Sequence, residues 1–298
     1  MILVTGATGT VGAQVVRLLA AAGRPVSAVS RDAAAAMPDG VRLVHGDSSQ
    51  PASIEAALDG VEAMLLAPRA LGQGAADLLK LAAAHAVRRV VLISALSVEY
   101  GGGHRRFSDE FRTLEEQVKA SGLRWTVLRC ADFAANSLAW APQILAAGRV
   151  RGAYGAAATA PLHELDLADV AVGALLSAEH VGRTYALTGP RSLTQFEKAQ
   201  IIGEAIGEPV EFVDSPPGQV RQAMLAQGLP PDVPERLLGH LADCVERPGP
   251  VTKDVEQLLG RPALTFRRWA DDHVAAFRGW NRHRLTTDRL TTGGPEAS

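Results

Sequence analysis

Residues 2–12 decide the fold, and they read Ile2-Leu3-Val4-Thr5-Gly6-Ala7-Thr8-Gly9-Thr10-Val11-Gly12. The first four residues are apolar or β-branched and predict a short buried strand, while Val11 begins an Ala- and Leu-rich stretch that predicts a helix. Gly6 permits a tight turn, and Gly12 lets the helix pack closely on the strand. Gly9 has no side chain, so a ligand group can approach the backbone there. The stretch therefore predicts a strand–turn–helix unit of an α/β fold.

A strand–turn–helix unit of this kind can bind phosphate, because the first N–H groups of the helix have no partner within the helix and carry the positive end of its dipole. The three-residue glycine spacing at the first strand–helix junction predicts, more specifically, a site for the pyrophosphate of a dinucleotide. A purely structural turn is the alternative. We expect the site to be formed by Gly6, Thr8, Gly9, Thr10, Val11 and Gly12.

Short apolar runs alternate with Ala- and Leu-rich stretches through the first 130 residues. This alternation predicts parallel strands covered by helices on both faces, and hence an α/β protein with a Rossmann-type doubly wound parallel sheet. We expect strands at 2–5, 25–30, 42–45, 63–67, 90–94 and 125–129, and helices at 11–22, 52–58, 75–85 and 109–120.

The regular alternation weakens after residue 129, which indicates a change in organisation. We expect a nucleotide-binding domain over residues 1–150 and a smaller mixed α/β part over 151–278, which covers the substrate and interleaves with the first. Within the second part we expect a strand–helix pair at 164–177, and the Thr194-x-x-Glu197 capping box predicts the start of another helix. We expect residues 279–298 to form a flexible tail.

The composition excludes several classes of protein. The 298 residues contain 30 Lys and Arg against 32 Asp and Glu, with no long block of like charge, so we expect no nucleic-acid partner. No apolar run approaches the length of about 18 residues that a membrane helix needs, so we expect no membrane association. Cys130 and Cys244 are isolated from each other, which predicts neither a disulfide framework nor a metal site. These features favour a cytoplasmic protein.

The residues after the second predicted strand should select the cofactor. Arg31 stands directly at the strand end, where a guanidinium can bind the 2′-phosphate of NADP(H). Asp32 could instead hold a ribose hydroxyl of NAD(H), but it could equally cap a short Ala-rich helix that follows it. We favour NADP(H), with NAD(H) as the alternative.

Further motifs lie along the rest of the chain. Together with the glycine turn they resemble the NmrA-like atypical short-chain dehydrogenases over most of the chain, from residue 1 to about residue 275, with the tail outside. The matching motifs are Thr5–Gly12, Gly46-Asp47, Ser121-Gly122-Leu123 before Trp125–Arg129, Phe133 and Asn136, Asp166 and Asp169, and Tyr185–Pro190.

The resemblance implies a role for several of these positions. The implied cofactor contacts are Asp47 and Ser48 at the adenine, and Ala67, Pro68 and Arg69 at the nicotinamide ribose. Phe133 and Asn136 would lie near the nicotinamide and the substrate, with core packing as the alternative for Phe133. Asp166 and Asp169 are expected to be structural and to cap the helix that follows them.

Active short-chain dehydrogenases carry a Ser at the end of the fifth strand, a Tyr about a dozen residues later and a Lys four residues beyond; the Tyr transfers the proton. Here Ser94 is present and is assigned to the cofactor site, but Phe107 and Phe111 occupy the other two positions. Neither ring can carry a proton. With Leu114 and Val118 they form an apolar helical stripe, so we expect both to be core residues or walls of the substrate pocket.

Three other residues are candidates near the nicotinamide. Tyr100 and His104 share the Tyr-to-Lys spacing, but the three glycines between them predict a loop rather than a helix. We keep both as candidate catalytic residues. His163 is a candidate substrate contact; with Glu164 it resembles part of a metal site, but two side chains do not make one, so we expect no metal.

The missing Tyr and Lys restrict the chemistry that the chain can support. Loss of a positioned general acid lowers a rate by about 10²–10⁴-fold. Reduction of a simple ketone would suffer most, whereas a quinone, an azo compound or a conjugated enone gives a stabilised anion that solvent can protonate. We therefore expect an NADP(H)-dependent oxidoreductase that acts on an electron-poor apolar small molecule. A non-catalytic NADP(H) sensor with a protein partner and a non-redox cyclase or isomerase are the alternatives.

Overall fold

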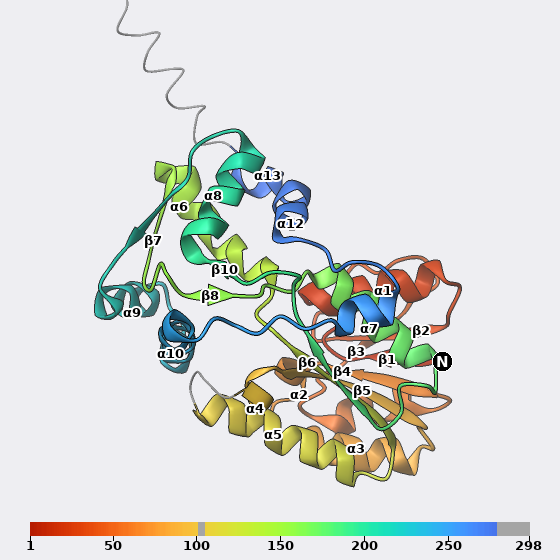
Figure 1. The fold of residues 1–298 in the computed structure, drawn as a ribbon. Helices are drawn as coiled ribbons and strands as arrows, with labels where there is room; N and C mark the ends of the chain where they lie inside the picture. Colours follow the sequence, from red (N-terminus) through yellow and green to blue (C-terminus); the bar gives the residue numbers. More distant parts are fainter. Residues whose placement is uncertain (101–104, 279–298) are drawn as a thin grey trace, which may run out of the picture.

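The computed structural model describes residues 1–100 and 105–278, and it is built around a seven-stranded sheet (Figure 1). The strands run in the order β3-β2-β1-β4-β5-β6-β9, and every neighbouring pair is parallel. This order is that of a doubly wound sheet and confirms the predicted fold class. The strands are β1 (Ile2–Val4), β2 (Val26–Ser30), β3 (Arg42–His45), β4 (Ala63–Leu66), β5 (Arg89–Ala95), β6 (Arg124–Cys130) and β9 (Arg183–Leu187).

Helices cover both faces of the sheet, because successive side chains of each buried strand point to opposite faces. Val91 and Ile93 of β5 join the apolar core under α1 and α7, whereas Val90 and Leu92 join the core under η1, α3 and α5. Figure 1 shows the two layers on either side of the sheet. The helices are α1 (Thr10–Ala21), α7 (Glu164–Leu176), the 3₁₀ helix η1 (Pro51–Leu58), α3 (Ala75–Ala84) and α5 (Arg105–Ala120).

The second part of the molecule leads from the carboxyl end of β6 and has an apolar core of its own. Trp269 and Phe277 are fully buried in this core with Ile144, Ile202 and Phe212. Two small strand pairs complete it, β7 (Arg149–Gly152) with β11 (Glu211–Asp214) and β8 (Ala158–Thr159) with β10 (Leu193–Thr194). Its helices are η2 (Ala134–Trp140), α6 (Ala141–Ala147), α8 (Gln195–Ile206), α9 (Pro217–Ala226), α10 (Asp232–Glu246), α12 (Phe266–Asp272) and α13 (Val274–Phe277).

The two parts interleave along the chain. Helix α7 and strand β9 follow the beginning of the second part in sequence, yet both pack in the first, β9 as the edge strand beside β6. Helix α11 (Asp254–Leu259) then returns to pack on α7 and β9. The first residue of α11 binds the edge strand, because the Asp254 carboxylate accepts the Ala186 N–H at 2.7 Å. The tail expected at 279–298 lies outside the described residues.

Of three local predictions, one is confirmed and two are wrong. The capping box at Thr194 and Glu197 is confirmed, with both of its reciprocal hydrogen bonds present at the start of α8. The helix expected after Asp32 is absent, and residues 33–36 form a turn and an irregular segment. The strand expected before α7 is also wrong: Leu162 makes a single parallel bridge with Phe133, and the helix begins two residues later.

Candidate dinucleotide-binding and active site

The glycine turn has the geometry that a bound pyrophosphate requires. Gly6 has φ of +62°, a conformation that other residues rarely adopt, and a Cβ there would lie 2.9 Å from the Ala67 Cβ. A Cβ on Gly12 would overlap the Gly6 carbonyl, so this glycine sets the close approach of α1 to the turn. A Cβ on Gly9 would meet only the Gly6 oxygen, at 3.3 Å. The space beside Gly9 is therefore open and fits a phosphate group.

The start of α1 offers its N–H groups to that space. Its N-cap is Gly9, which has no side chain to accept a hydrogen bond from the first turn of the helix. Thr8 and Thr10 are exposed beside it, whereas the Val11 side chain is buried in the core and leaves only its backbone for a ligand. The predicted residues thus lie together at one helix start, where a phosphate would be stabilised.

Arg31 and Asp32 follow β2 and differ in the contacts that their side chains make. The Asp32 carboxylate accepts the Ala34 N–H at 2.8 Å and so closes the turn that replaces the expected helix. Arg31 is exposed and lies close enough to Asp47 to contribute to the lowered pKa of that carboxyl group. The larger cause of this pKa shift is Ser49, whose N–H and hydroxyl both donate to Asp47. Arg31 therefore keeps an accessible guanidinium at the strand end.

The predicted adenine and nicotinamide contacts lie in the loops after β3 and β4. Asp47 is half-buried after β3, whereas the Ser48 side chain is only 3% exposed. The Thr5 hydroxyl accepts the Ala67 N–H at 2.8 Å and donates to the Leu65 carbonyl at 2.9 Å. These bonds hold the β4 loop beside the glycine turn. The loop continues as the short helix α2 (Pro68–Leu71), from which the Arg69 side chain is exposed.

Ser94 points into the interface between the sheet and α5, where it meets a buried carboxylate. Its hydroxyl donates to Glu115 Oε1 at 2.7 Å, and Arg129 Nε and Nη2 donate to the two oxygens of Glu115 at 2.9 and 2.8 Å. Glu115 is only 1% exposed. Burial raises the pKa of its carboxyl group, but the hydrogen bonds from Arg129 and Ser94 outweigh burial and leave that pKa below its usual value.

The sequence analysis did not predict this cluster of Ser94, Glu115 and Arg129, although the position of Glu115 on α5 indicates it. Glu115 follows Phe111 by four residues and precedes Val118 by three, so it lies on the apolar stripe of α5. A carboxylate on a buried helical stripe needs a cation nearby, and Arg129 at the end of β6 supplies it. The cluster fixes α5 against the ends of β5 and β6.

The remaining candidate residues surround the carboxyl ends of β5 and β6. Tyr100 ends the short helix α4 (Ser97–Tyr100) and is 48% exposed. Position 107 lies in the first turn of α5, and Phe111 is half-buried one turn later. Phe133 is half-buried and packs against the core, which fits its alternative as a core residue, and Asn136 is exposed on η2. His104 lies outside the described residues.

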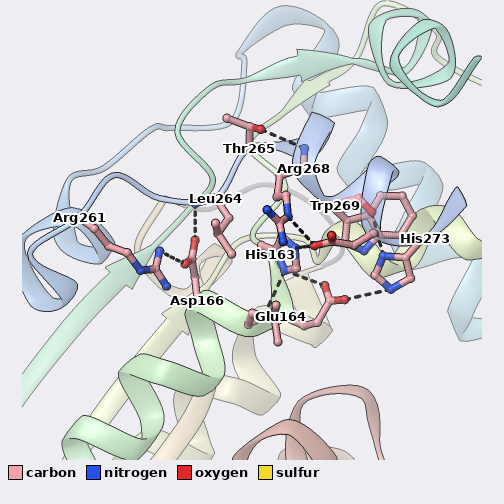
Figure 2. A network of polar contacts seen from close by, with 11 residues as sticks. His163, Glu164, Asp166, Arg261, Leu264, Thr265, Arg268, Trp269 and His273 are labelled. Carbon is pink, nitrogen blue, oxygen red and sulfur yellow. Dashed lines mark hydrogen bonds and ion pairs between the residues drawn. The ribbon is translucent and has the colours of Figure 1, made fainter. Parts of the chain in front are cut away.

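His163 is buried at the junction of α7 and the C-terminal helices (Figure 2). It is the N-cap of α7, and its Nδ1 accepts the Leu165 N–H at 3.2 Å, which places the remaining ring proton on Nε2. Burial lowers the pKa of His163. The titratable groups facing it are Glu164 and Asp166 on α7, with Asp272 and His273 at the end of α12. The expected substrate contact thus lies in an internal polar network.

Asp166 and Asp169 do not cap α7, and this expectation is wrong. Both lie within the helix, and they bind the segment that leads into α12 (Figure 2 shows Asp166). Arg261 reaches Asp166 and Asp169 at 2.7 Å each, and Asp166 also accepts the Leu264 N–H at 2.7 Å. The two carboxylates therefore anchor the C-terminal segment on α7. The cap is supplied by His163 instead.

The sheet order and the open turn at Gly9 define a Rossmann-type dinucleotide-binding protein. Residues 6–177 match the NAD(P)H-binding family, and the chain belongs to this family. The resemblance to the NmrA-like atypical short-chain dehydrogenases is confirmed. Within residues 1–100 and 105–278, no helix is long and apolar enough to cross a membrane, and no three His, Cys, Asp or Glu residues gather as metal ligands.

Curated relatives match nearly the whole chain. A (4-alkanoyl-5-oxo-2,5-dihydrofuran-3-yl)methyl phosphate reductase of Streptomyces griseus is 37% identical, with 93% of this chain and 99% of that protein covered. An NAD(P)H azoreductase of Xenophilus azovorans is 34% identical at the same coverages. Among solved structures, an NADPH-dependent quinone oxidoreductase of Escherichia coli in complex with NADPH superposes with a TM-score of 0.78 at 26% identity, over 91% of this chain and 99% of that chain.

Proposed function

We propose that this protein transfers a hydride from NADPH to an electron-poor, conjugated small molecule such as a quinone, an azo compound or an enone. NADPH, when bound, supplies the hydride. The names of the relatives support the acceptor class, because they describe reductases of a dihydrofuranone conjugated with an alkanoyl group, of azo compounds and of quinones. In each of these acceptors the charge that follows hydride transfer is delocalised.

The observation that carries the proposal is the state of the proton-transfer positions on α5. Phenylalanine occupies positions 107 and 111, and within residues 108–120 of the helix the buried polar side chains are Ser108 and Glu115. Its lowered pKa keeps Glu115 ionised, so it cannot donate a proton, and it accepts the hydrogen bond that the Ser94 hydroxyl donates. The acceptor should therefore be one whose anion persists until solvent protonates it. Tyr100 and His104 stay our candidates for any protein-supplied proton.

The proposed cofactor site lies in the loops that follow the first four strands. The backbone at Gly9, Thr10 and Gly12 would hold the pyrophosphate, and the exposed Arg31 would bind the 2′-phosphate that distinguishes NADPH from NADH. Asp32 supports this choice, because its carboxylate already closes a turn. The loops after β3 and β4, with Asp47, Ser48 and residues 67–69, would contact the adenine and the nicotinamide ribose.

The substrate would lie between the carboxyl ends of β5 and β6 and the second part. Phe111, Phe133 and Asn136 are the described candidates for its walls, and Phe107 stays a candidate from the sequence alone. Two half-buried rings favour an apolar conjugated acceptor over a sugar. His163 lies deeper, in the polar network under α12, and is not part of these walls.

Steady-state NADPH oxidation with a matched set of acceptors tests the proposal. The set pairs each quinone, azo dye and conjugated enone with a saturated ketone of similar size. We expect turnover of the conjugated compounds and at least about 10²-fold less of the ketones, since these need a positioned acid. Comparable rates on ketones would contradict the proposal. NADPH binding without turnover of any acceptor would favour the sensor alternative.

A further inference from the structure

A lysine of the second part is buried at the carboxyl end of the sheet. Lys198 of α8 is only 4% exposed, and its Nζ donates to the Thr159 hydroxyl of β8 at 2.6 Å and to Asp132 Oδ2 at 3.3 Å. The Thr159 hydroxyl donates in turn to the same oxygen of Asp132 at 2.8 Å. A lysine is almost never buried without a partner of opposite charge, and here that partner is Asp132.

These contacts leave one oxygen of the Asp132 carboxylate available to a ligand. Oδ2 accepts both hydrogen bonds, whereas Oδ1 accepts none from residues 1–100 or 105–278. The Asp132 side chain is 22% exposed, and Oδ1 is not buried. Because Thr159 and Lys198 hold the other oxygen, Asp132 presents a hydrogen-bond acceptor in a fixed direction.

Asp132 lies among the segments that surround the proposed substrate. It follows β6 by two residues, at the edge of the sheet outside which the ligands of open α/β folds bind. Cys130, the last residue of β6, accepts the Leu96 N–H at 2.8 Å, and the helix that ends in Tyr100 begins directly after Leu96. Phe133, a candidate wall of the substrate site, is the next residue after Asp132. A substrate bound between these segments would have the free oxygen within reach.

Lys198 also decides which chemical group this oxygen suits. The Lys198 ammonium balances the charge of Asp132, so the pair offers a cation no net attraction. A neutral hydroxyl can donate to Oδ1 without displacing either existing hydrogen bond. Stability alone does not account for the pair, because apolar residues in place of a buried ion pair are often as stable or more so. The observations therefore favour recognition of a neutral hydrogen-bond donor.

We propose that Asp132 determines specificity by accepting a hydrogen bond from a hydroxyl group on the conjugated substrate, and that Lys198 is the residue that positions and neutralises it. The inference rests on the proposed function, since it names a group that the substrate carries away from its reacting atoms. An apolar site with one fixed polar group holds a planar molecule in one orientation. The hydroxyl would thus set which edge of the conjugated system lies over the nicotinamide.

The test uses naphthoquinones that carry a hydroxyl on alkyl arms of graded length, each paired with its methyl ether, which cannot donate. The readout is the ratio of kcat/KM for the alcohol to kcat/KM for the ether. We expect wild type to favour the alcohol by at least about tenfold at one arm length, chiefly through KM, as for one charge-assisted hydrogen bond.

Asp132→Asn is the test variant, and Asp214→Asn is the control. The amide oxygen of the test variant can keep the bonds from Thr159 and Lys198, which places an N–H donor where the free oxygen was, so the ratio should fall to about one. The Asp214 carboxylate is exposed on β11 and accepts the Gly155 N–H at 3.1 Å, so the control should keep the wild-type ratio. Asp132→Asn combined with Lys198→Met gives the same comparison without an unpaired buried ammonium, should the single variant not fold.

Lys198→Met alone tests the positioning role. It leaves the charge of Asp132 unbalanced, so a dimethylammonium arm should gain about fivefold or more in kcat/KM over the alcohol, relative to wild type. A lysine that only supported the fold would change both arms alike, and that result would contradict its role.

Two further results would overturn the proposal: a wild-type ratio near one at every arm length, or a folded Asp132→Asn protein with the wild-type ratio. If neither alcohols nor ethers are reduced, the proposed function fails for these acceptors, and calorimetry of both series with the NADP⁺-loaded protein decides the inference. Tighter binding of an alcohol than of its ether, lost in Asp132→Asn and kept in Asp214→Asn, would support it. Equal binding of the two, or none, would refute it.

Discussion

Replacement of Gly9 by Val separates cofactor binding from folding more cleanly than any other change in the glycine turn. Gly9 has φ of −79° and ψ of 169°, an extended conformation that any residue adopts. A Cβ there meets only the Gly6 oxygen, at 3.3 Å, so the valine side chain points into open space in the free protein. We expect the free energy of unfolding to change by less than about 0.5 kcal/mol, as at other exposed positions.

The same side chain would fill the space of the pyrophosphate in the complex. If it displaces two charge-assisted hydrogen bonds from the start of α1, each worth about 1.5–3 kcal/mol, NADPH binding weakens by about 10²–10⁴-fold. Gly12→Val provides the contrast, because its Cβ would overlap the Gly6 carbonyl oxygen and lie 2.8 Å from the carbonyl carbon. That variant should lose stability as well as binding. Gly173→Ala on α7, where a Cβ meets nothing within 4 Å, is the control for glycine replacement.

Fluorescence titration of NADPH measures the affinity, and urea unfolding measures the stability of the same preparations. We expect Gly9→Val to unfold at the urea concentration of wild type and to show no saturation by NADPH in the range that saturates wild type. A folded Gly9→Val protein with wild-type affinity would refute the phosphate site. Loss of stability comparable to that of Gly12→Val would instead show that the space beside Gly9 is needed for folding.

Three further changes test the rest of the site. Arg31→Met should weaken NADPH binding about 10- to 100-fold and leave NADH binding unchanged, because the lost contact is to the 2′-phosphate alone; calorimetry with both cofactors measures this, and equal losses would assign the ribose to Asp32. Tyr100→Phe should lower turnover of a quinone by less than about tenfold, since solvent supplies the proton; a hundredfold loss with intact NADPH binding would identify Tyr100 as the acid. The lowered pKa of His163 means that the folded state takes up its proton less readily than the unfolded chain, so stability should fall as the pH drops below about 6.5. Urea unfolding at neutral and mildly acidic pH checks this against His163→Asn, which keeps an N-cap but does not titrate; an identical pH dependence of the two proteins would exclude His163 as the cause.

Polar contacts on α7 help to attach the C-terminal helices to the first part. Asp166 is fully buried and binds both Arg261 and the backbone of Leu264, while Glu164 lies 3.3 Å from His273. Removal of Arg261 would leave the buried Asp166 carboxylate with the Leu264 N–H and without its cation, which destabilises the folded state. These carboxylates thus add polar contacts to the apolar packing of α11 on α7.

The sequence by itself determined the sheet, the glycine turn and the class of cofactor. Each of these features depends on residues that are close together in the sequence. β-branched runs alternate with Ala- and Leu-rich stretches, which predicts the sheet. Gly6, Gly9 and Gly12 have the spacing that a tight turn before a helix requires. The observed bounds of β3 agree with the predicted ones, β1, β2 and β4 are each one residue shorter than predicted, and β5 and β6 extend one residue further at each end. The capping box at Thr194 was likewise readable, since both of its partners lie within one turn.

Tertiary structure alone decided which charged residues meet. Glu115 binds Ser94 and Arg129, which belong to different strands, and Asp166 binds an arginine 95 residues further along the chain. No local pattern marks such pairs, because their partners are chosen by how the sheet order and the helix packing bring distant segments together. For the same reason the sequence placed His163 in the substrate site, whereas packing under α12 buries it in a polar network. Local sequence patterns indicate which elements form and roughly where, and long-range packing decides the electrostatic surroundings of each side chain.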